Sequence, residues 1–553
     1  MAQEHAQAQH VTLHERSESE YSRGAAGSNR RDASGKFTRP SIWLSLSGGG
    51  FRAGIFHYGC LKRLRELGLL GHVYAFSAAS GGAIVAALLH AHCKGPASGT
   101  DGQAKLEDYD WELFERGFLS LVRRGVFGPM MLLLVVYALY FLGAVLFGEF
   151  WLLIRPYAQF SGWKGTPEVL WVAARALAIA IFLAGLVLHA CLAKMLMNEG
   201  AHRPAETAVP TAPLKSSDTQ AGWEHGSVAR LVRMLLLSAY LRRQILNLRA
   251  FHGTLLKQIH TQPKLFLTAV DLNAGRETIF TAGLFADLSE RGCRCLWEQR
   301  ADGDENTAGN VELAQAVSAS SAFWPFFHPE AIRNERGVIG VFIDGGMLDY
   351  YALNVPRAFG VRIDGRGDGQ DGGRQPSFRE EISFVLGLDG CKAATVKTKT
   401  HWSRGASMFR LKAVMVDQNY DAVELFAREF DRDLGIRSAI AGLEFGFPQG
   451  NPLHDTQLNR YLARVRTHLD SFSREETAAL AYCGYLQMDR AIAEGLPLSE
   501  YAGARATPPA AFEEILPAYC GPWKSSVAAL RKHLRYSNRR QLLLRMCGRM
   551  FGV

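Results

Sequence analysis

The amino-acid sequence predicts an α/β protein, on three observations. The segment "SIWLSLS" at 41–47 reads as a short buried strand, and the glycine-rich "GGGFRAG" and a helical run that ends at Gly68 follow it directly. A second apolar strand at 73–76 leads through a small-residue turn at 78–81 into another helix. Far downstream, the strand "VFI" ends at Asp344. Strands that alternate with helices in this way are typical of an α/β fold.

Length and composition limit the number of structural units and the kinds of partner that the protein can have. A chain of 553 residues is long enough to form two or more structural units. Its 62 Lys and Arg against 53 Asp and Glu give a net charge of +9, a mild excess that favours an anionic surface. No basic block is interleaved with aromatic residues, so we expect no nucleic-acid partner. Nine cysteines are scattered, and the one close pair, Cys293 and Cys295, lies too close for a disulfide or a metal site, which indicates a reducing compartment.

The glycine loop after the first strand is a candidate anion site. Gly48, Gly49 and Gly50 allow close approach of a ligand to the backbone, and their amides lie at the start of a helix, where a developing oxyanion is stabilised. Neither the dinucleotide-binding nor the P-loop glycine spacing is present. The alternative is a purely structural turn.

Ser80, in "SAASGGA", is a candidate nucleophile. A serine raised on a strained strand-to-helix turn needs very small residues two positions to either side, and Ser80 has Ala78 and Gly82 there. Alanine at 78 departs from the glycine that such turns usually have. The alternative is that this serine only begins a buried helix.

Asp344 is the best candidate for the base that a nucleophilic serine needs. Gly345 and Gly346 follow it and allow a turn that exposes the carboxylate to a cleft, although an Asx-type turn that closes the strand is the simpler alternative. Three other acids end strands or begin turns: Asp271, Asp349 and Asp389. Of these, only Asp349 lies near enough in the sequence to line the same cleft. We expect the histidines to be surface or packing residues.

Together and in this order, "SGGGFRAG", "AASGG" and "DGG" make the chain resemble the patatin-like phospholipase family. The resemblance continues in "PKLFLTAVDLNAGRETIF" as a strand pair, in "AVSASSAFWPFFHP" as a Ser/Ala-rich helix before the aspartate strand, and in "ETAALAYCGYLQMDRAI" as a C-terminal helix. It covers about 40–98 and 250–500. Single residues that fit the family are His57, Gly59, Asn354 and Pro356.

The resemblance implies a patatin-like three-layer α/β/α hydrolase fold and a Ser-Asp dyad that needs no cofactor and no metal. Ser80 would be the nucleophile, Asp344 the general base, and the amides of the three loop glycines the oxyanion hole. Arg52 falls at the family's basic position, where it would brace the loop or meet a lipid phosphate. These groups form a coherent set, because a serine needs an adjacent base and an ester's tetrahedral oxyanion needs fixed donors.

Two apolar runs, at 126–148 and 176–193, interrupt the two halves of the predicted fold. The first has no charged residue and the second only His189 as a polar residue, so each can cross a hydrocarbon core of roughly 30 Å as a helix. The alternative is a helical hairpin buried in a soluble lid. A transmembrane hairpin keeps Ser80 and Asp344 on one side of the membrane, and the excess of basic residues in its flanks predicts a multi-pass protein whose catalytic domain is cytoplasmic.

The expected organisation divides the chain into five parts. They are a disordered arm at 1–40, the first part of the patatin-like domain at 41–98, an insertion with the hairpin and a linker at 99–227, the second part of the domain at 228–500, and a basic helical tail at 501–553.

The expected function is that of a membrane-bound serine hydrolase that cleaves acyl esters of phospholipids through an acyl-enzyme. Its partners would be a membrane phospholipid, or another acyl-ester lipid, and the bilayer itself. A neutral-lipid hydrolase or an acyltransferase on the same dyad is one alternative. A membrane scaffold that keeps the fold but has an inactive site is another.

Overall fold

The structure is a computed structural model that forms two compact units, 1–124 with 230–539 and 125–229 with 540–553. All the predicted catalytic motifs belong to the first unit. The residues that the structure describes are 41–92, 110–126, 242–243, 245–259, 263–281, 284–289, 292–298, 311–323, 327–334, 337–357, 382–390, 436–467, 469–516 and 527–535, with isolated positions at 36, 139, 143, 430 and 537 and between 172 and 187.

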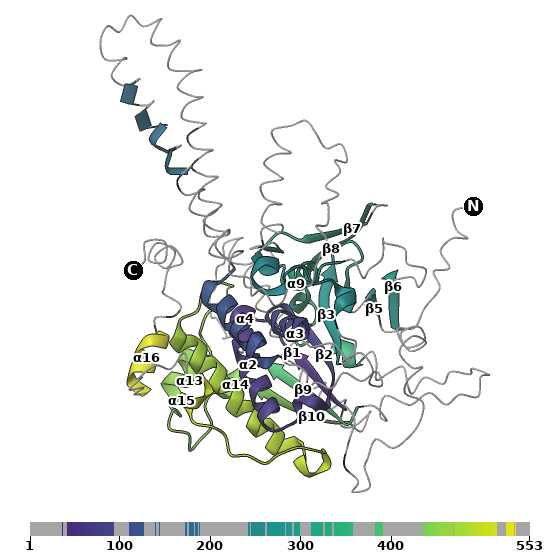
Figure 1. Cartoon of the computed structure of the whole chain (residues 1–553), viewed down its shortest axis with the longest axis vertical. Helices are drawn as coiled ribbons and strands as arrows, with labels where there is room; N and C mark the ends of the chain where they lie inside the picture. Colours follow the sequence, from purple (N-terminus) through teal and green to yellow (C-terminus); the bar gives the residue numbers. More distant parts are fainter. Residues whose placement is uncertain are drawn as a thin grey trace, which may run out of the picture. The chain divides into compact units, whose positions relative to one another are not determined.

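A ten-stranded mixed sheet organises the first unit (Figure 1). Its order is β10-β9-β1-β2-β3-β4-β5-β6, and β8 pairs with both β3 and β7. The strands from β10 to β3 are parallel, and all other pairings are antiparallel. The bounds are β1 (Ile42–Leu46), β2 (Val73–Ala79), β3 (Lys264–Asp271), β4 (Arg276–Thr281), β5 (Leu284–Ser289), β6 (Gly292–Glu298), β7 (Glu330–Asn334), β8 (Gly337–Asp344), β9 (Phe384–Asp389) and β10 (Arg437–Gly442).

Helices pack on one face of the parallel strands. α14 covers the face of the sheet that carries Phe384, whose ring lies against Gly495 at the end of that helix. α14 packs on α2, α2 on α3, and α3 on α9, so the four form a continuous layer (Figure 1). The helices of the first unit are α2 (Gly50–Glu66), α3 (Ser80–Ala91), α4 (Trp111–Arg124), α9 (Leu313–Ser320), α13 (Thr456–Leu462), α14 (Arg474–Gly495), α15 (Phe512–Ile515) and α16 (Val527–Arg535).

The opposite face of the sheet has its own apolar cluster. Trp43 and Val385, which are paired across β1 and β9, lie there with Phe266 of β3. The chain just after Asp344 packs on them through Tyr351 and Leu353. Because β1 and β9 are buried along their whole length and are mostly apolar, they have the character of central parallel strands. The predicted α/β class is therefore confirmed as a mixed sheet with helices.

Element boundaries differ from the predictions around the glycines. The first helix begins at Gly50, within the predicted loop, and β2 continues to Ala79, so the predicted turn is compressed into Ser80. Glycine has a poor helix propensity, which is why the sequence favoured a loop. Tertiary packing decides otherwise: an added Cβ at Gly54 would lie 3.3 Å from the carbonyl oxygen of Gly81 in α3.

The predicted hairpin falls almost entirely outside the described residues. The run at 126–148 is described at three positions and the run at 176–193 at scattered ones. Within the described part of the chain, no helix is long and apolar enough to cross a membrane. The described positions between 172 and 187 are helical, and five of their large apolar side chains are 51–63% exposed. The predicted N-terminal arm, apart from Lys36, also lies outside the description.

Candidate active site

Ser80 stands on a sharp turn between β2 and α3. Its φ of 50° is left-handed, a conformation that a residue with a Cβ adopts only at a cost of about 1–3 kcal/mol. The next two residues must be glycines. A Cβ added to Gly81 would lie 2.0 Å from the Gly50 carbonyl oxygen, and a Cβ added to Gly82 would lie 2.6 Å from the Leu46 carbonyl oxygen. The strained serine and its two obligatory glycines are the geometry of a nucleophile elbow. Ala78, the departure noted in the sequence, is accommodated as a buried residue of β2.

The pairing of β3 brings Asp344 to the same place. β2 runs along one edge of β3 until Ala79 lies opposite Thr268. β4 occupies the other edge, so β8, which pairs with β3 from Ala269 onward, must continue along the edge that β2 has left. β8 runs in the opposite direction and ends with Asp344 opposite Ala269. The ends of β2 and β8 therefore meet head-on, and Ser80 and Asp344 leave the sheet at adjacent positions.

The turn after β8 holds the Asp344 carboxylate in place. Its Oδ1 accepts a hydrogen bond from the Gly346 amide at 2.8 Å, and its own amide donates to the Ala322 carbonyl at 3.1 Å. Gly345 lies so close to Thr268 that an added Cβ would be 2.4 Å from that carbonyl oxygen. The Asx-type turn that closes the strand is therefore present, and it orients a carboxylate that is buried beside the elbow and not exposed to a cleft. The role of Asp344 as a base stays a prediction.

The glycine loop differs from the prediction at one residue. The Gly48 amide donates to the Tyr350 carbonyl at 2.8 Å, so it is not available to an oxyanion. Among the described residues, no acceptor contacts the amides of Gly49 and Gly50 at the start of α2. The Gly81 amide, directly after Ser80 and against Gly50, is a third candidate donor that the glycine motif did not point to.

Two further residues position this loop and the elbow. Ser320, the last residue of α9, accepts a hydrogen bond from the Ser80 amide at 3.0 Å through its Oγ. Tyr350 packs its ring over Gly48 and places its hydroxyl 2.8 Å from an added Cβ at Gly49. Neither residue was singled out in the sequence. The only available signal was the run of hydroxyl and small residues in "AVSASSA".

Arg52 lies beneath the loop and braces it. Its Nε donates to the Gly390 carbonyl at 3.1 Å, and its Nη1 donates to the carbonyls of Ala463 and Val465 at 3.2 and 3.0 Å. The side chain is buried. Of the two predicted roles, bracing of the loop is the one that these contacts support.

His57 lies in α2, the helix that follows the glycine loop, and its ring is buried. Its Nε2 lies 3.0 Å from the Leu388 carbonyl oxygen and 3.4 Å from the Ser47 hydroxyl. Burial lowers the pKa of His57 to about 3, and the hydrogen bond with Leu388 only partly opposes this. The neutral ring is therefore a packing residue, as expected.

The other acids that end strands have structural partners. The carboxylate of Asp271 accepts the Asn273 amide, and that of Asp349 accepts the amides of Tyr351 and Asn354. Burial raises the pKa of Asp349 to about 6, and the backbone hydrogen bonds oppose that shift. Asp349 thus closes the turn that carries the chain away from the site. Within the described residues, no group of three or more His, Cys, Asp or Glu is arranged to hold a metal ion.

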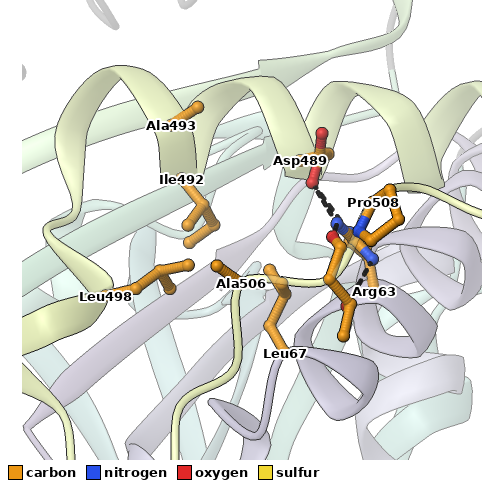
Figure 2. Close-up of a pocket in the computed structure, with 9 residues that line it drawn as sticks. Arg63, Leu67, Asp489, Ile492, Ala493, Leu498, Ala506 and Pro508 are labelled. Carbon is orange, nitrogen blue, oxygen red and sulfur yellow. Dashed lines mark hydrogen bonds and ion pairs between the residues drawn. The ribbon is translucent and has the colours of Figure 1, made fainter.

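A cavity of about 310 Å³ lies at the far end of α2 and is separate from this site. Figure 2 shows Arg63 on its wall pointing toward Asp489 of α14. The Nε of Arg63 donates to that carboxylate at 2.8 Å, and its Nη1 donates to the Tyr485 hydroxyl at 3.1 Å. The helix places Arg63 roughly 20 Å from Gly50. This arginine ties α2 to α14 and takes no part in the chemistry at the elbow.

One of three comparisons with known proteins identifies a family. A family model described as "Patatin-like phospholipase" matches residues 44–356, which include the glycine loop, the elbow and Asp344. A search of curated proteins finds no significant match. Two solved structures are similar in part: VipD from Legionella pneumophila, and a chain of the complex of full-length SpcU with full-length ExoU from the type III secretion system of Pseudomonas aeruginosa.

Both matches cover most of this chain, but at low sequence identity and with low TM-scores. The VipD match has 13% identity and a TM-score of 0.28, and it covers 84% of this chain and 69% of VipD. The second match has 15% identity and a TM-score of 0.20, and it covers 72% of this chain and 55% of the other. The family model matches more than half of the chain, and its range contains the elbow and the strand end described above. The chain belongs to the patatin-like phospholipase family, whose members are lipid ester hydrolases.

Proposed function

We propose that the protein is a membrane-bound hydrolase that cleaves acyl esters of phospholipids through a dyad of Ser80 and Asp344. The observation that carries the proposal is the meeting of β2 and β8 on one edge of β3, with a strained serine at one end and a buried carboxylate at the other. The combination of a serine, a base and unpaired amides suits acyl transfer.

In the first half of the reaction the Ser80 Oγ attacks the ester carbonyl carbon while Asp344 accepts its proton. The negative charge moves to the carbonyl oxygen, where the amides of Gly49, Gly50 and Gly81 are the candidate donors. Collapse of the tetrahedral intermediate breaks the bond to the alcohol, which leaves with the proton from Asp344. The acyl chain remains on Ser80 as an ester.

In the second half of the reaction, water takes the place of the Ser80 hydroxyl as the attacking group. Asp344 takes a proton from the water, whose oxygen attacks the acyl carbon, and the proton returns to the Ser80 Oγ as the fatty acid leaves. His57 takes no part, since its ring is fully buried against the Leu388 carbonyl oxygen and burial lowers its pKa to about 3, which makes it a weak base. The dyad therefore needs only one carboxylate that alternates between base and acid.

The first prediction tests the nucleophile with a fluorophosphonate probe and with phospholipid vesicles. Purified full-length protein in detergent is expected to be labelled and to release fatty acid. Ser80→Ala is expected to do neither, because no other hydroxyl stands on the strained turn. The control is Ser77→Ala, which removes a buried serine of the same strand that is hydrogen-bonded to Trp43 and Ser45.

Equal labelling of Ser80→Ala and wild type would exclude this nucleophile, and absence of labelling in the folded wild type would favour an inactive scaffold. Transfer of the acyl chain to an added alcohol, in place of fatty-acid release, would identify an acyltransferase. Release from triacylglycerol emulsions but not from phospholipid vesicles would identify a neutral-lipid hydrolase.

The proposal places the protein in a membrane through the hairpin at 126–148 and 176–193. The exposed apolar side chains at Val172, Leu177, Ile179, Leu183 and Val187 support it, because a helix that exposes such residues is stabilised by an apolar surrounding. The net charge of +9 supports attraction to anionic lipid. The basic flanks of the hairpin favour a cytoplasmic catalytic domain.

The second prediction concerns this attachment. The full-length protein is expected to float with phospholipid vesicles in a density gradient and to resist extraction by alkaline carbonate. Replacing Leu177 and Leu183 together by Glu is expected to release it, because charges are costly in hydrocarbon. The control is Leu272→Glu, which puts the same charge at a leucine that is 48% exposed in the first unit. If the double variant floats as wild type does, these positions are not in the membrane.

A further inference from the structure

A buried cluster of charges surrounds Glu330 of β7, the strand that pairs with the strand ending at Asp344, and is not used by the steps above. Its centre is Arg242, whose side chain is fully buried. The Nε of Arg242 donates to the Ser318 hydroxyl at 2.9 Å, and one Nη donates to the Ser318 carbonyl at 2.9 Å. The guanidinium also lies over the Phe327 ring, 4.8 Å from its centroid. Its other terminal nitrogen, Nη1, is buried without a hydrogen-bond partner.

Glu330 is the anion of the cluster. It is buried in β7, and its carboxylate lies 3.8 Å from Arg242 and accepts a hydrogen bond from the Ser318 hydroxyl at 3.0 Å. Arg243 also approaches it at 3.8 Å. Burial raises the pKa of Glu330, and the two arginines oppose that change. The arginines and the Ser318 hydroxyl favour the charged form of Glu330, but burial is the larger effect, so its pKa remains raised.

The strand register connects this cluster to the proposed base. Glu330 lies opposite Phe342 in the antiparallel pair of β7 and β8. Residues directly opposite each other share a face, and so do residues two apart in one strand, so Glu330 and Asp344 project to the same side. Ser318, which binds Arg242, is one helical turn before Ala322, whose carbonyl accepts the Asp344 amide.

The charge of Arg242 reflects this proximity. Burial lowers the pKa of Arg242 to about 10, and the carboxylates of Glu330 and Asp344 oppose that shift. The guanidinium is therefore cationic at neutral pH. Since Asp344 contributes to its electrostatic environment, the reverse holds as well, and Arg242 favours the ionised form of Asp344.

We propose that Arg242 and Glu330 are positioning residues that set the charge of the Asp344 base, with Arg242 keeping it ionised and Glu330 limiting that effect. The inference rests on the proposed dyad. A buried carboxylate alone is driven toward its neutral form, which cannot accept a proton, while a cation without a counter-anion would make it a weaker base. Alternating charges, from Glu330 through Arg242 to Asp344, give an ionised base that keeps its basicity.

Other charged groups near Asp344 do not reverse the effect of Arg242, which favours the ionised form of Asp344. On the described elements packed around it, the charged and titratable groups are Arg242, Arg243, Glu330 and Arg333, Lys264 and Asp271 of β3, and Asp349 and Tyr350 after β8. Arg243 also forms an ion pair with Glu312, whose carboxylate oxygen lies 3.8 Å from the Arg243 Nε. Asp271 is held by its own turn.

The third prediction is the pH dependence of kcat/KM for a soluble nitrophenyl butyrate, measured on full-length protein in detergent. Arg242→Gln removes the cation, so ionisation of Asp344 becomes harder, and the acid limb of the profile is expected to move to higher pH by about one unit or more. Glu330→Gln removes the competing anion, and the same limb is expected to move to lower pH. Arg242→Lys keeps the charge and is expected to keep the wild-type limb.

Opposite shifts from two uncharged replacements distinguish this role from a merely structural one. The control is Arg437→Gln, which breaks an ion pair with Glu500 at the other end of the sheet and is expected to leave the limb unmoved. If Arg242→Gln does not fold, Glu330→Gln and the double neutral variant decide, since the double variant leaves no unpaired buried charge. The double variant is then expected to fold, with its limb between those expected for the two single variants.

Two failures are distinguishable. If Asp344→Asn keeps its activity and its acid limb, the proposed base is wrong. If Asp344→Asn is inactive while Glu330→Gln and the Arg242 variants all retain the wild-type limb, or shift it in one direction, the dyad stands and the charge-setting role is overturned.

Discussion

Replacing Asp344 by Asn is expected to lower kcat for ester hydrolysis by about 10²–10⁴-fold, with the fold intact. Asn keeps an oxygen that accepts the Gly346 amide, as the Asp344 Oδ1 does at 2.8 Å, so the turn after β8 is preserved. The amide cannot accept the Ser80 proton, so the nucleophile is left without a base. Steady-state kinetics on a nitrophenyl ester, with circular dichroism to verify folding, measures this fourth prediction.

Asp455→Asn is the matched control. Asp455 is the N-cap of α13 and accepts the Leu458 amide at 2.7 Å, a role that Asn fills equally well. It is expected to leave the activity unchanged. Activity of Asp344→Asn within threefold of wild type would show that the proton of Ser80 goes elsewhere.

Gly484→Ala is expected to destabilise the first unit by roughly 3 kcal/mol or more. α2 and α14 cross at two glycines: an added Cβ at Gly484 would lie 2.0 Å from the Phe56 carbonyl oxygen, and one at Gly59 would lie 1.8 Å from the Ala481 carbonyl oxygen. Both obstacles are backbone atoms in packed helices, so a methyl group can be accommodated only if the helices separate. α2 begins at the glycine loop beside Ser80, so activity is expected to fall with stability.

The midpoint of thermal unfolding measures this fifth prediction, and Gly71→Ala is its control. Gly71 has no atom within 4 Å of an added Cβ and needs no left-handed backbone, so its replacement is expected to change the free energy of unfolding by less than about 0.5 kcal/mol. Equal midpoints for Gly484→Ala and wild type would mean that the two helices do not approach each other this closely.

Much of the site was predictable because it is local. The strand, glycine loop and helix around Gly49, and the strand, serine and helix around Ser80, are each formed by a few consecutive residues. Their small residues are needed for backbone geometry, and that need is visible in the sequence. The 474–495 helix and the 264–281 strand pair were expected from the resemblance to the family, and the structure contains both.

What the sequence could not predict depends on partners far away along the chain. The Gly48 amide donates to the Tyr350 carbonyl, and the Ser80 amide donates to the Ser320 hydroxyl. Arg242 forms an ion pair with Glu330. No local pattern specifies these pairs, because they arise where the sheet brings separate segments together.

The sequence by itself thus determined the family, the α/β class and the candidate nucleophile and base. Only the tertiary structure decided how they meet: β3 shares one edge between the parallel β2 and the antiparallel β8, so Ser80 and Asp344 arrive from opposite directions. The physical reason is that β2 pairs with β3 up to Thr268 and β8 pairs from the next residue, Ala269, so no unpaired residue of β3 separates the two strand ends. Two strand ends on one edge are therefore brought into contact, whatever their separation in the sequence.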